Sequence, residues 1–346
     1  MIITTRYRIE KLIYVSLPIV RARNYCRKPN SWILKVVLTT IATLLVASCS
    51  SPKDNSGAGS ILTKGGESAY VTFGNLTTTG MIPVDLRTNN VGSVVGVPIA
   101  GDFGDIAISP NGKTAYLTSG RGTIQTGAIV AIDLSTNAVL KTYYLPKNQS
   151  AIALASAPDG QTAYVTTGNG HNLGIIPINL ATGNEGDIID LPDLTGRTLS
   201  GGGIAISPDG KTAYVTSGPV GAGLVVVNLA TRKVVNTIAL PDGAEDVAVT
   251  PDGRTAVVTT ARETGPSIVR VNLSTKSVDK IINLAQGQSA LAVAITPDGQ
   301  STFVTASIGA GVSVLSINIA RFVVGTSIGL PQGNGSFDIA IGSKNT

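Results

Sequence analysis

Residues 207–218 read SPDGKTAYVTSG, and residues 109–120 read SPNGKTAYLTSG. The two stretches differ at only two positions, one of them Asn for Asp and the other Leu for Val. The residue at the centre of the AYVT segment recurs at intervals of 46, 48, 50, 43 and 46 residues, at Tyr70, Tyr116, Tyr164, Tyr214, Val257 and Phe303. A period of about 46 residues predicts an array of similar structural units.

Each unit contains four short runs rich in Val, Ile, Thr and Tyr, the residues that favour β-strands. One run ends in Pro-Asp-Gly or Pro-Asn-Gly, the AYVT run follows, a third run ends in Asp-Leu or Asn-Leu, and most units finish at Leu-Pro. The third run is apolar on both faces, as in LVVVNL (224–229), which suits a sheet packed between two others about 10 Å away. Four strands per repeat predict the blades of an all-β, closed β-propeller.

The sequences between these runs have the chemistry of tight turns. Pro presets φ, Asp or Asn bonds the backbone two residues on, and Gly tolerates positive φ. A short carboxylate or amide closes every third run, at Asp85, Asp133, Asn179, Asn228, Asn272 and Asn318. We expect each of these side chains to bond the backbone of the turn that follows it.

The two ends of the array complement each other. The first repeat lacks the inner-strand segment that precedes AYVT elsewhere, whereas residues 338–342 read DIAIG, an inner-strand segment followed only by SKNT. If this C-terminal strand joins the three strands of residues 67 to about 98, the chain forms six complete four-stranded blades. Such closure removes the exposed ends that an open array must cap.

The sequence of the repeat resembles that of the YVTN family of β-propellers, most clearly in ISPDGKTAYVT (206–216) and VVVNLATRKVVNTI (225–238). Members of that family occur in archaeal surface layers and among exported bacterial proteins. The resemblance covers residues 67 to 342 and implies the propeller fold, although the family usually has seven blades rather than six. It implies no particular activity.

The N-terminal region has the features of an export signal. Cationic residues within 27–35 precede a twelve-residue apolar run, 36–47, which is too short to span a bilayer as a helix but suits a signal-peptide core. The run continues into LLVASCSS, which resembles a bacterial lipobox and implies lipidation of Cys49 as the mature N-terminus. Several acyl chains, at about 0.8 kcal/mol per buried CH₂, would anchor the protein stably. The alternative is an ordinary secretory signal with a cysteine there by chance.

These features divide the chain into three parts. Residues 1–48 form the leader, of which 1–26 are either part of a long signal or an extension upstream of the true start. Residues 49–66 comprise the lipidated cysteine and a Gly/Ser-rich tether, and residues 67–346 form the propeller. Because cleavage removes Cys26 and lipid consumes Cys49, we expect no disulfide in the mature protein.

The charge distribution argues against nucleic acid as a partner. The leader holds eight Lys/Arg residues and one Glu, so it carries a net +7 and accounts for the basic net charge of +5 of the whole chain. The remaining 18 Lys/Arg and 20 Asp/Glu are scattered, with no basic stripe.

The loops opposite the repeated turns differ between repeats, and such loops around a central channel are where propellers bind ligands. Asp105, Asp246 and Asp338 precede inner strands, and Glu245 lies beside one of them. If they converge at the channel mouth, these carboxylates are candidate Ca²⁺ ligands, as in six-bladed calcium-dependent lactonases. In the other repeats the equivalent positions hold residues without a ligand side chain, Ala153, Gly203 and Ala292. The favoured interpretation is therefore that each carboxylate caps its own loop backbone.

The other candidates for ligand binding are charged residues of the same loops. His171, the sole histidine, cannot by itself build a His-based metal site or a haem site with two axial histidines. Arg121, Arg197, Arg262 and Glu263 are either ligand contacts or solvated surface residues. The four tyrosines of the AYVT and AYLT segments occur once per repeat, which favours packing over ligand stacking. No residue is assigned a catalytic role.

The sequence therefore favours a lipid-anchored propeller of the bacterial cell envelope, exported and folded as a monomeric ring. Its expected role is non-enzymatic binding or scaffolding of an envelope protein or glycan, without a cofactor. The alternative is a calcium-dependent, lactonase-like hydrolase that uses the channel carboxylates. The two differ in whether Asp105, Asp246 and Asp338 point together into the channel.

Overall fold

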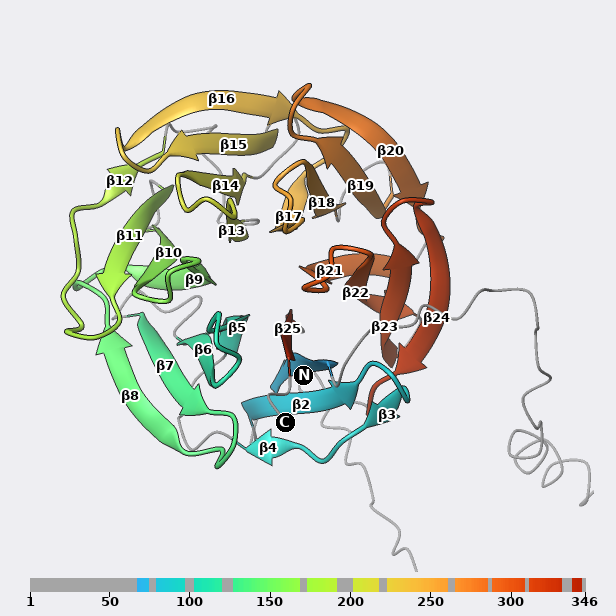
Figure 1. The fold of residues 1–346 in the computed structure, drawn as a ribbon, viewed down its shortest axis with the longest axis horizontal. Coiled ribbons are helices and arrows are strands. Elements are labelled where there is room, and N and C mark those ends of the chain that lie inside the picture. The colour runs from blue at the N-terminus through green and yellow to red at the C-terminus, as the bar shows by residue number, and fades with distance from the viewer. Residues whose placement is uncertain are drawn as a thin grey trace, which may run out of the picture. The chain divides into compact units, whose positions relative to one another are not determined.

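Six antiparallel sheets are arranged in a ring in the computed structural model of the chain (Figure 1). All of the described residues lie within one compact unit, Gly59–Thr346. The structure describes residues 67–74, 79–96, 103–119, 127–168, 173–191, 202–217, 223–260, 265–285, 288–308, 311–331 and 338–343.

Five of the blades are contiguous in sequence, and each has four strands that run in order from the channel outward. Blade 2 consists of β5 (Phe103–Ile108), β6 (Thr114–Ser119), β7 (Ala128–Asp133) and β8 (Val139–Tyr144). Blade 3 consists of β9 (Ser150–Ser156), β10 (Thr162–Gly168), β11 (Leu173–Asn179) and β12 (Ile189–Asp190). Blade 4 consists of β13 (Ile204–Ile206), β14 (Thr212–Thr216), β15 (Gly223–Asn228) and β16 (Lys233–Ala239). Blade 5 consists of β17 (Ala244–Val249), β18 (Thr255–Thr260), β19 (Ser267–Asn272) and β20 (Ser277–Asn283). Blade 6 consists of β21 (Gln288–Ile295), β22 (Ser301–Ile308), β23 (Gly311–Asn318) and β24 (Val323–Gly329).

Blade 1 combines the two ends of the propeller, as the sequence predicted. Its inner strand is β25 (Ile339–Ser343), which pairs antiparallel with β1 (Glu67–Gly74). β2 (Thr79–Asp85) follows, and two short segments, β3 (Asn90–Val91) and β4 (Val95–Gly96), both pair with β2 at the outer edge. Figure 1 shows β25 on the channel side of this blade, so the prediction of six four-stranded blades closed by the C-terminal strand is confirmed.

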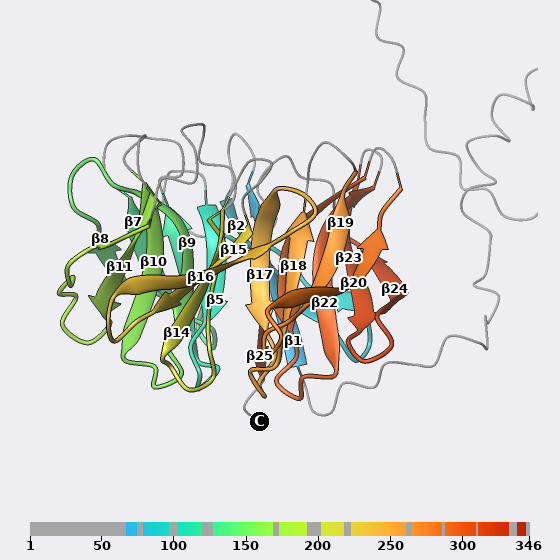
Figure 2. The same cartoon turned by 90° about the horizontal axis from the view of Figure 1, so that it is seen from above.

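The repeated turns lie together on one face of the ring, the lower face in Figure 2. In each Pro-Asp-Gly or Pro-Asn-Gly turn the glycine has positive φ, at Gly112, Gly160, Gly210, Gly253 and Gly299. Asp209 Oδ1 accepts hydrogen bonds from Ser207 Oγ at 2.5 Å and from the Lys211 N–H at 3.1 Å. Asp133 likewise accepts bonds from the Ser135 hydroxyl and from the N–H groups of Ser135 and Thr136, and these hydrogen bonds lower its pKa to about 2. The turn chemistry predicted from the sequence is therefore confirmed.

Apolar side chains fill the spaces between neighbouring blades. One buried cluster joins Val71 and Ile82 of blade 1 to Phe303, Val314 and Ile328 of blade 6, so the last blade packs on the first. The repeated tyrosines belong to such clusters, since Tyr116 is buried against Ala151 and Leu154 of the next blade. These contacts give the tyrosines the packing role that their recurrence, once per repeat, indicated.

Polar contacts at the outer edge link some blades as well. Tyr143 Oη donates to Leu180 O at 2.7 Å between blades 2 and 3, and Arg232 pairs with Asp187 at 2.9 Å between blades 4 and 3. Arg270 of blade 5 donates to Ile319 O at 2.6 Å and lies over the ring of Phe322 in blade 6. Because they join residues of different blades, these contacts stiffen the ring rather than single sheets.

Candidate functional site

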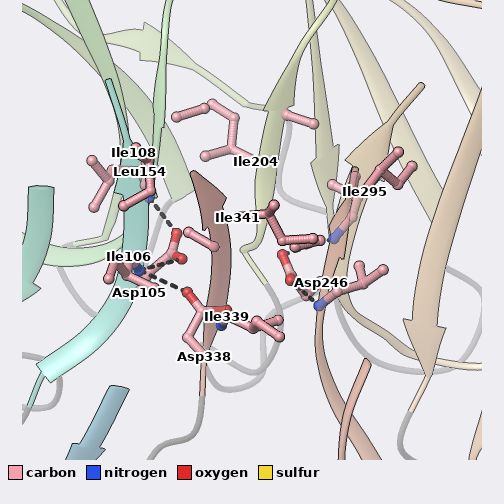
Figure 3. Close-up of a pocket in the computed structure, with 18 of the residues that line it drawn as sticks. Asp105, Ile106, Ile108, Leu154, Ile204, Asp246, Ile295, Asp338, Ile339 and Ile341 are labelled. Atoms are coloured by element: carbon pink, nitrogen blue, oxygen red, sulfur yellow. Dashed lines mark hydrogen bonds between the residues drawn. The ribbon is translucent and has the colours of Figure 1, made fainter. Parts of the chain in front are cut away.

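A hollow of about 240 Å³ lies at the centre of the ring and is lined by the inner strands of all six blades. Most of its lining residues are aliphatic, among them Ile106, Ile108, Ile204, Ile295 and Ile341, but most of the surface that they present to the hollow is polar. Three carboxylates also line it, those of Asp105, Asp246 and Asp338 (Figure 3). The volume exceeds the ~150 Å³ that accommodates benzene but falls below the roughly 300 Å³ of the smallest drug-sized pockets.

A β-bulge in several inner strands determines how these side chains are placed. The register shifts between Ala151 and Ala153 opposite β10, between Ala244 and Asp246 opposite β18, and between Ala290 and Ala292 opposite β22. A bulge leaves one residue of the strand without its ladder partner, so its N–H and C=O groups need other partners.

Six buried threonines, two positions after each central AYVT residue, provide such partners. Thr166 Oγ1 accepts from the Ala153 N–H of its own blade at 3.0 Å and donates to Gly202 O of the next blade at 2.5 Å. Thr259 Oγ1 bonds Asp246 N and Leu291 O in the same way, each at 3.1 Å. We call this set the threonine ring; its members, all 0% exposed, are Thr72, Thr118, Thr166, Thr216, Thr259 and Thr305.

The threonine ring was not predicted from the sequence. The available signal was a hydroxyl residue at one fixed position of every repeat, within an otherwise apolar strand. A buried hydroxyl needs a hydrogen-bond partner. What the sequence could not show is that the partner belongs to the next blade.

Each of the three carboxylates joins the inner strands of two blades. Asp105 accepts from its neighbour Ile106 N at 2.7 Å and from Leu154 N of blade 3 at 2.6 Å. Asp246 accepts from Val247 N at 2.7 Å and from Val293 N of blade 6 at 2.8 Å. Bonds from N–H groups to an ionised carboxylate are stronger than those between neutral groups, so these residues strengthen the blade junctions.

Asp338 makes the same kind of link from the closing strand. Its Oδ1 accepts from Ile339 N at 2.8 Å, and its Oδ2 accepts from Ile106 N of blade 2 at 2.7 Å. Asp105 therefore shares the Ile106 N–H with Asp338, which brings these two carboxyl groups close together (Figure 3).

The structure refines the predicted positions of these acids. Asp338 directly precedes its strand as expected, but Asp105 and Asp246 lie inside β5 and β17, because those strands begin two residues earlier. Glu245 also lies within β17, and its carbonyl accepts from Thr216 Oγ1 at 2.9 Å and from Gly203 N at 3.3 Å. Within the described ranges, no three His, Cys, Asp or Glu side chains are grouped closely enough to hold a metal ion.

Gly203 occupies the position of Asp105 in blade 4, and the neighbouring strand comes very near to it. A Cβ atom there would lie 2.5 Å from Asp246 Oδ1, 2.7 Å from Asp246 Cα and 2.9 Å from Glu245 O. The junction of blades 4 and 5 thus depends on the absence of a side chain at Gly203.

Burial raises the pKa of Asp338 to about 7, because desolvation outweighs the hydrogen bonds from Ile106 and Ile339 that act to lower it. The residue is only 7% exposed. Its carboxyl group is therefore partly protonated near neutral pH while it joins blades 1 and 2.

The raised pKa of Asp338 predicts that the ring becomes less stable as the pH rises. Below pH 3.8, the ordinary value, the carboxyl is neutral in both folded and unfolded chains. Between there and about pH 7 only the unfolded chain loses the proton, so the free energy of unfolding should fall with pH. Urea unfolding of the wild type at pH 4, 5.5, 7 and 8 should show this trend, and Asp338→Asn should flatten it. Asp187→Asn, at an exposed outer-edge carboxylate, is the control, and an unchanged slope in Asp338→Asn would contradict the assignment.

Six of the predicted site residues lie outside the residues that the structure describes. They are Cys49, Arg121, His171, Arg197, Arg262 and Glu263. The leader and tether, residues 1–66, lie outside them too, and among the described residues no helix has the length and apolar character needed to cross a bilayer.

One short stretch of the sequence matches a nucleophile motif. Residues 325–329 read GTSIG, which fits the G-x-S-x-G pattern. That pattern works when its serine sits on a sharp turn between a strand and a helix. Ser327 instead lies in β24, an outer strand, where it is exposed, so the motif does not form a nucleophile elbow here.

These features define the chain as a six-bladed β-propeller in which the threonine ring and three aspartates join the inner strands. No protein-family model matches the chain, and no curated protein matches its sequence. The YVTN resemblance therefore remains a prediction.

Solved structures share the fold. TolB from Acinetobacter baumannii superposes with a TM-score of 0.62 at 18% identity, over 92% of this chain and 74% of TolB. A chain of a nidogen/laminin complex gives a TM-score of 0.63 at 13% identity, over 81% of this chain and 100% of that one. A Bacteroides caccae protein of unknown function gives 0.60 at 12% identity, over 80% of this chain and 99% of that one. At these identities the likeness is one of fold alone.

Proposed function

We propose that the chain is a non-enzymatic binding or scaffolding module of the bacterial cell envelope. Cys49 carries the lipid that anchors it to a membrane, residues 50–66 serve as a tether, and the partner is an envelope protein or glycan. The proposal rests on what the three aspartates that line the channel bind. Asp105, Asp246 and Asp338 each accept backbone N–H groups from two blades, so they serve the scaffold.

The fold itself is suited to this role. Closure by β25 and the bonds between inner strands make a rigid ring, and the repeated turns occupy one face of it. The other connections between strands differ in sequence from blade to blade, and variable loops on a rigid scaffold are typical binding elements. A propeller with a similar fold was solved in a nidogen/laminin complex, so this architecture supports protein binding in at least one other case.

The anchor is tested by Cys49→Ala. Full-length wild-type protein made in a bacterium should incorporate labelled palmitate and sediment with membranes, because several acyl chains give stable attachment. Cys49→Ala should lose the label and appear in the soluble fraction, while its melting temperature stays that of the wild type. Ser51→Ala, two residues away, is the control and should behave as the wild type. Retention of Cys49→Ala on membranes would contradict lipidation.

The binding role is tested by crosslinking in intact envelopes followed by capture of the full-length chain. A shortened variant, in which a Gly-Ser link replaces residues 192–200, should capture less partner while melting at the wild-type temperature. The matched control replaces the same number of residues in the tether. Equal capture by the two variants would move the binding surface away from this loop.

The hydrolase alternative makes the opposite prediction for calcium. If Asp105, Asp246 and Asp338 bound Ca²⁺ in the folded state, calcium would raise the melting temperature and a chelator would lower it. The triple variant Asp105→Asn, Asp246→Asn, Asp338→Asn would lose that shift. Calorimetry with calcium and with chelator decides between the two functions, and we expect no calcium-dependent shift.

A further inference from the structure

We infer that the face of the ring formed by the repeated turns lies next to the membrane, so that the opposite face is presented to the envelope partner. The inference rests on the anchor at Cys49, which is part of the proposed function. It adds which surface of the propeller meets the phospholipid headgroups and which surface remains open to a partner.

The tether joins the ring on the face of the repeated turns. In blades 2 to 6 a Pro-Asp-Gly or Pro-Asn-Gly turn connects the inner strand to the second strand, whereas in blade 1 these two strands are the last and the first of the ring. Their register pairs Glu67, where β1 begins, with Ser343, where β25 ends. Both residues therefore lie at the end of the sheet at which the other blades carry the turn (Figure 2).

One backbone hydrogen bond identifies the position of Glu67 within the repeat. The Glu67 carbonyl accepts a bond of 3.3 Å from the N–H of Leu86, the residue that follows the third strand of blade 1. In every other blade the residue directly after the turn glycine accepts the equivalent bond, and these residues are Lys113, Gln161, Lys211, Arg254 and Gln300. Glu67 thus takes the place of the residue that ends the repeated turn.

The length of the tether limits how the ring can be oriented at the membrane. Seventeen residues, 50–66, separate Cys49 from Glu67. A Gly/Ser-rich linker of that length has an r.m.s. end-to-end distance of roughly 23 Å. The longest strands have eight residues, which at 3.3 Å per residue gives the ring a height of roughly 26 Å between its two faces.

The opposite face could meet the bilayer only if the tether passed around the rim. It would have to cross the two outer strands of blade 1, about 4.8 Å apart, and then the height of the ring, a path of roughly 35 Å. Seventeen residues span at most roughly 60 Å when fully extended, so most of the tether would be stretched along the ring. Such stretching costs conformational entropy, whereas the turn face can approach the bilayer without it.

The chemistry of the turn face suits lipid headgroups rather than acyl chains. Hydrogen bonds from the Ser207 and Thr250 hydroxyls lower the pKa values of Asp209 and Asp252, so the turns carry ionised carboxylates. Among the described residues, the large exposed hydrophobic side chains lie on or beside the outer strands, at least one in each blade: Val94, Val139, Leu140, Tyr144, Ile188, Val235, Ile281, Val323 and Val324. These side chains are spread around the whole rim, so they favour no one side of it for contact with the bilayer.

The test places a fluorescent donor at either end of β20 in blade 5. Ser274→Cys introduces a thiol in the turn before this strand, Ala285→Cys introduces one beyond its end, and both positions are exposed. The full-length chain is produced in a bacterium, labelled and reconstituted into vesicles that contain a lipid with an acceptor dye on its headgroup. Because lipid occupies the Cys49 thiol, the introduced cysteine is the only free one in the mature protein.

Energy transfer from Ser274→Cys should exceed transfer from Ala285→Cys at least about twofold, since the length of β20 separates the two positions by roughly 23 Å. Equal transfer would place the rim against the bilayer, and the reverse order would place the opposite face there. Either result would overturn the inference.

A second pair of variants repeats the measurement in blade 2, which lies across the channel from blade 5 (Figure 1). Ala138→Cys precedes β8 on the turn face and Lys147→Cys follows it on the opposite face, and both positions are exposed. Greater transfer from Ala138→Cys would show that the whole turn face, rather than one edge of a tilted ring, lies next to the membrane. Greater transfer from Lys147→Cys would contradict the orientation.

The control lengthens the tether in the labelled variants. Insertion of about 34 Gly/Ser residues after Gly59 raises the r.m.s. length to roughly 40 Å, which exceeds the height of the ring, so the difference in transfer should largely disappear. An undiminished difference would show that the tether does not set the orientation. Sedimentation with the vesicles separates this inference from the anchor. Protein that stays unbound would overturn both, whereas bound protein with equal transfer from the two ends would overturn the orientation alone.

Discussion

Deletion of residues 338–346 is expected to lower the free energy of unfolding of the ring by roughly 5 kcal/mol or more, which is comparable with the entire stability of many domains. The deletion removes β25, and with it the five residue pairs that β25 forms with β1. It also removes the bonds between Thr72 N and Asp338 O and between Asp338 N and Thr72 Oγ1, both 2.9 Å.

The damage should extend beyond blade 1. Ile339 is buried in the cluster that joins blades 1 and 6, and Asp338 bonds Ile106 of blade 2, so the closing strand contacts the blades on both sides. Its loss leaves β1 as an unpaired edge that faces the channel. We expect lower urea and thermal midpoints and faster proteolysis throughout residues 67–331.

The control for this experiment is deletion of residues 344–346 alone, which leaves all of β25 in place. That variant should melt within a degree or two of the wild type. If both deletions melt alike, the C-terminal strand does not close the ring.

Gly203→Ala is expected to destabilise the ring by about 2–4 kcal/mol, a large effect for the addition of one methyl group. The new Cβ would lie 2.5 Å from Asp246 Oδ1 and 2.7 Å from Asp246 Cα. The carboxylate cannot easily move away, because it accepts bonds from the N–H groups of Val247 and Val293. Blades 4 and 5 would therefore have to separate.

The matched control is Gly329→Ala in β24, where a Cβ would meet no atom within 4 Å. It should change the free energy of unfolding by no more than about 0.5 kcal/mol. Both variants are measured by urea unfolding of the full-length protein. Similar stabilities for the two would show that blades 4 and 5 are farther apart than the structure places them.

The deletion and the Gly203→Ala substitution differ in how far their effects could be predicted from the sequence. The deletion follows from the repeat itself, since residues 338–342 read like an inner strand and the first repeat lacks one. The effect of Gly203→Ala does not follow from the repeat. The repeat places Ala153 and Ala292 at the position equivalent to Gly203, which by itself suggests that alanine is acceptable there.

The strands, the turns and the number of blades could be predicted from the sequence, because each depends on residues close together in the chain. Pro-Asp-Gly sets the dihedral angles of its own turn, and the third-strand Asp or Asn bonds the backbone two or three residues on. Repetition then fixed the architecture, since six units with complementary ends close into a ring.

The contacts of the channel residues, in contrast, could not be predicted from the sequence. The sequence placed Asp105, Asp246 and Asp338 near the channel, but their partners in other blades, Leu154, Val293 and Ile106, lie 49, 47 and 232 residues away. Whether a carboxylate reaches such a partner or a metal ion depends on the bulge in each inner strand and on the spacing between blades. Those are set by the packing of all six sheets at once, which no single repeat encodes.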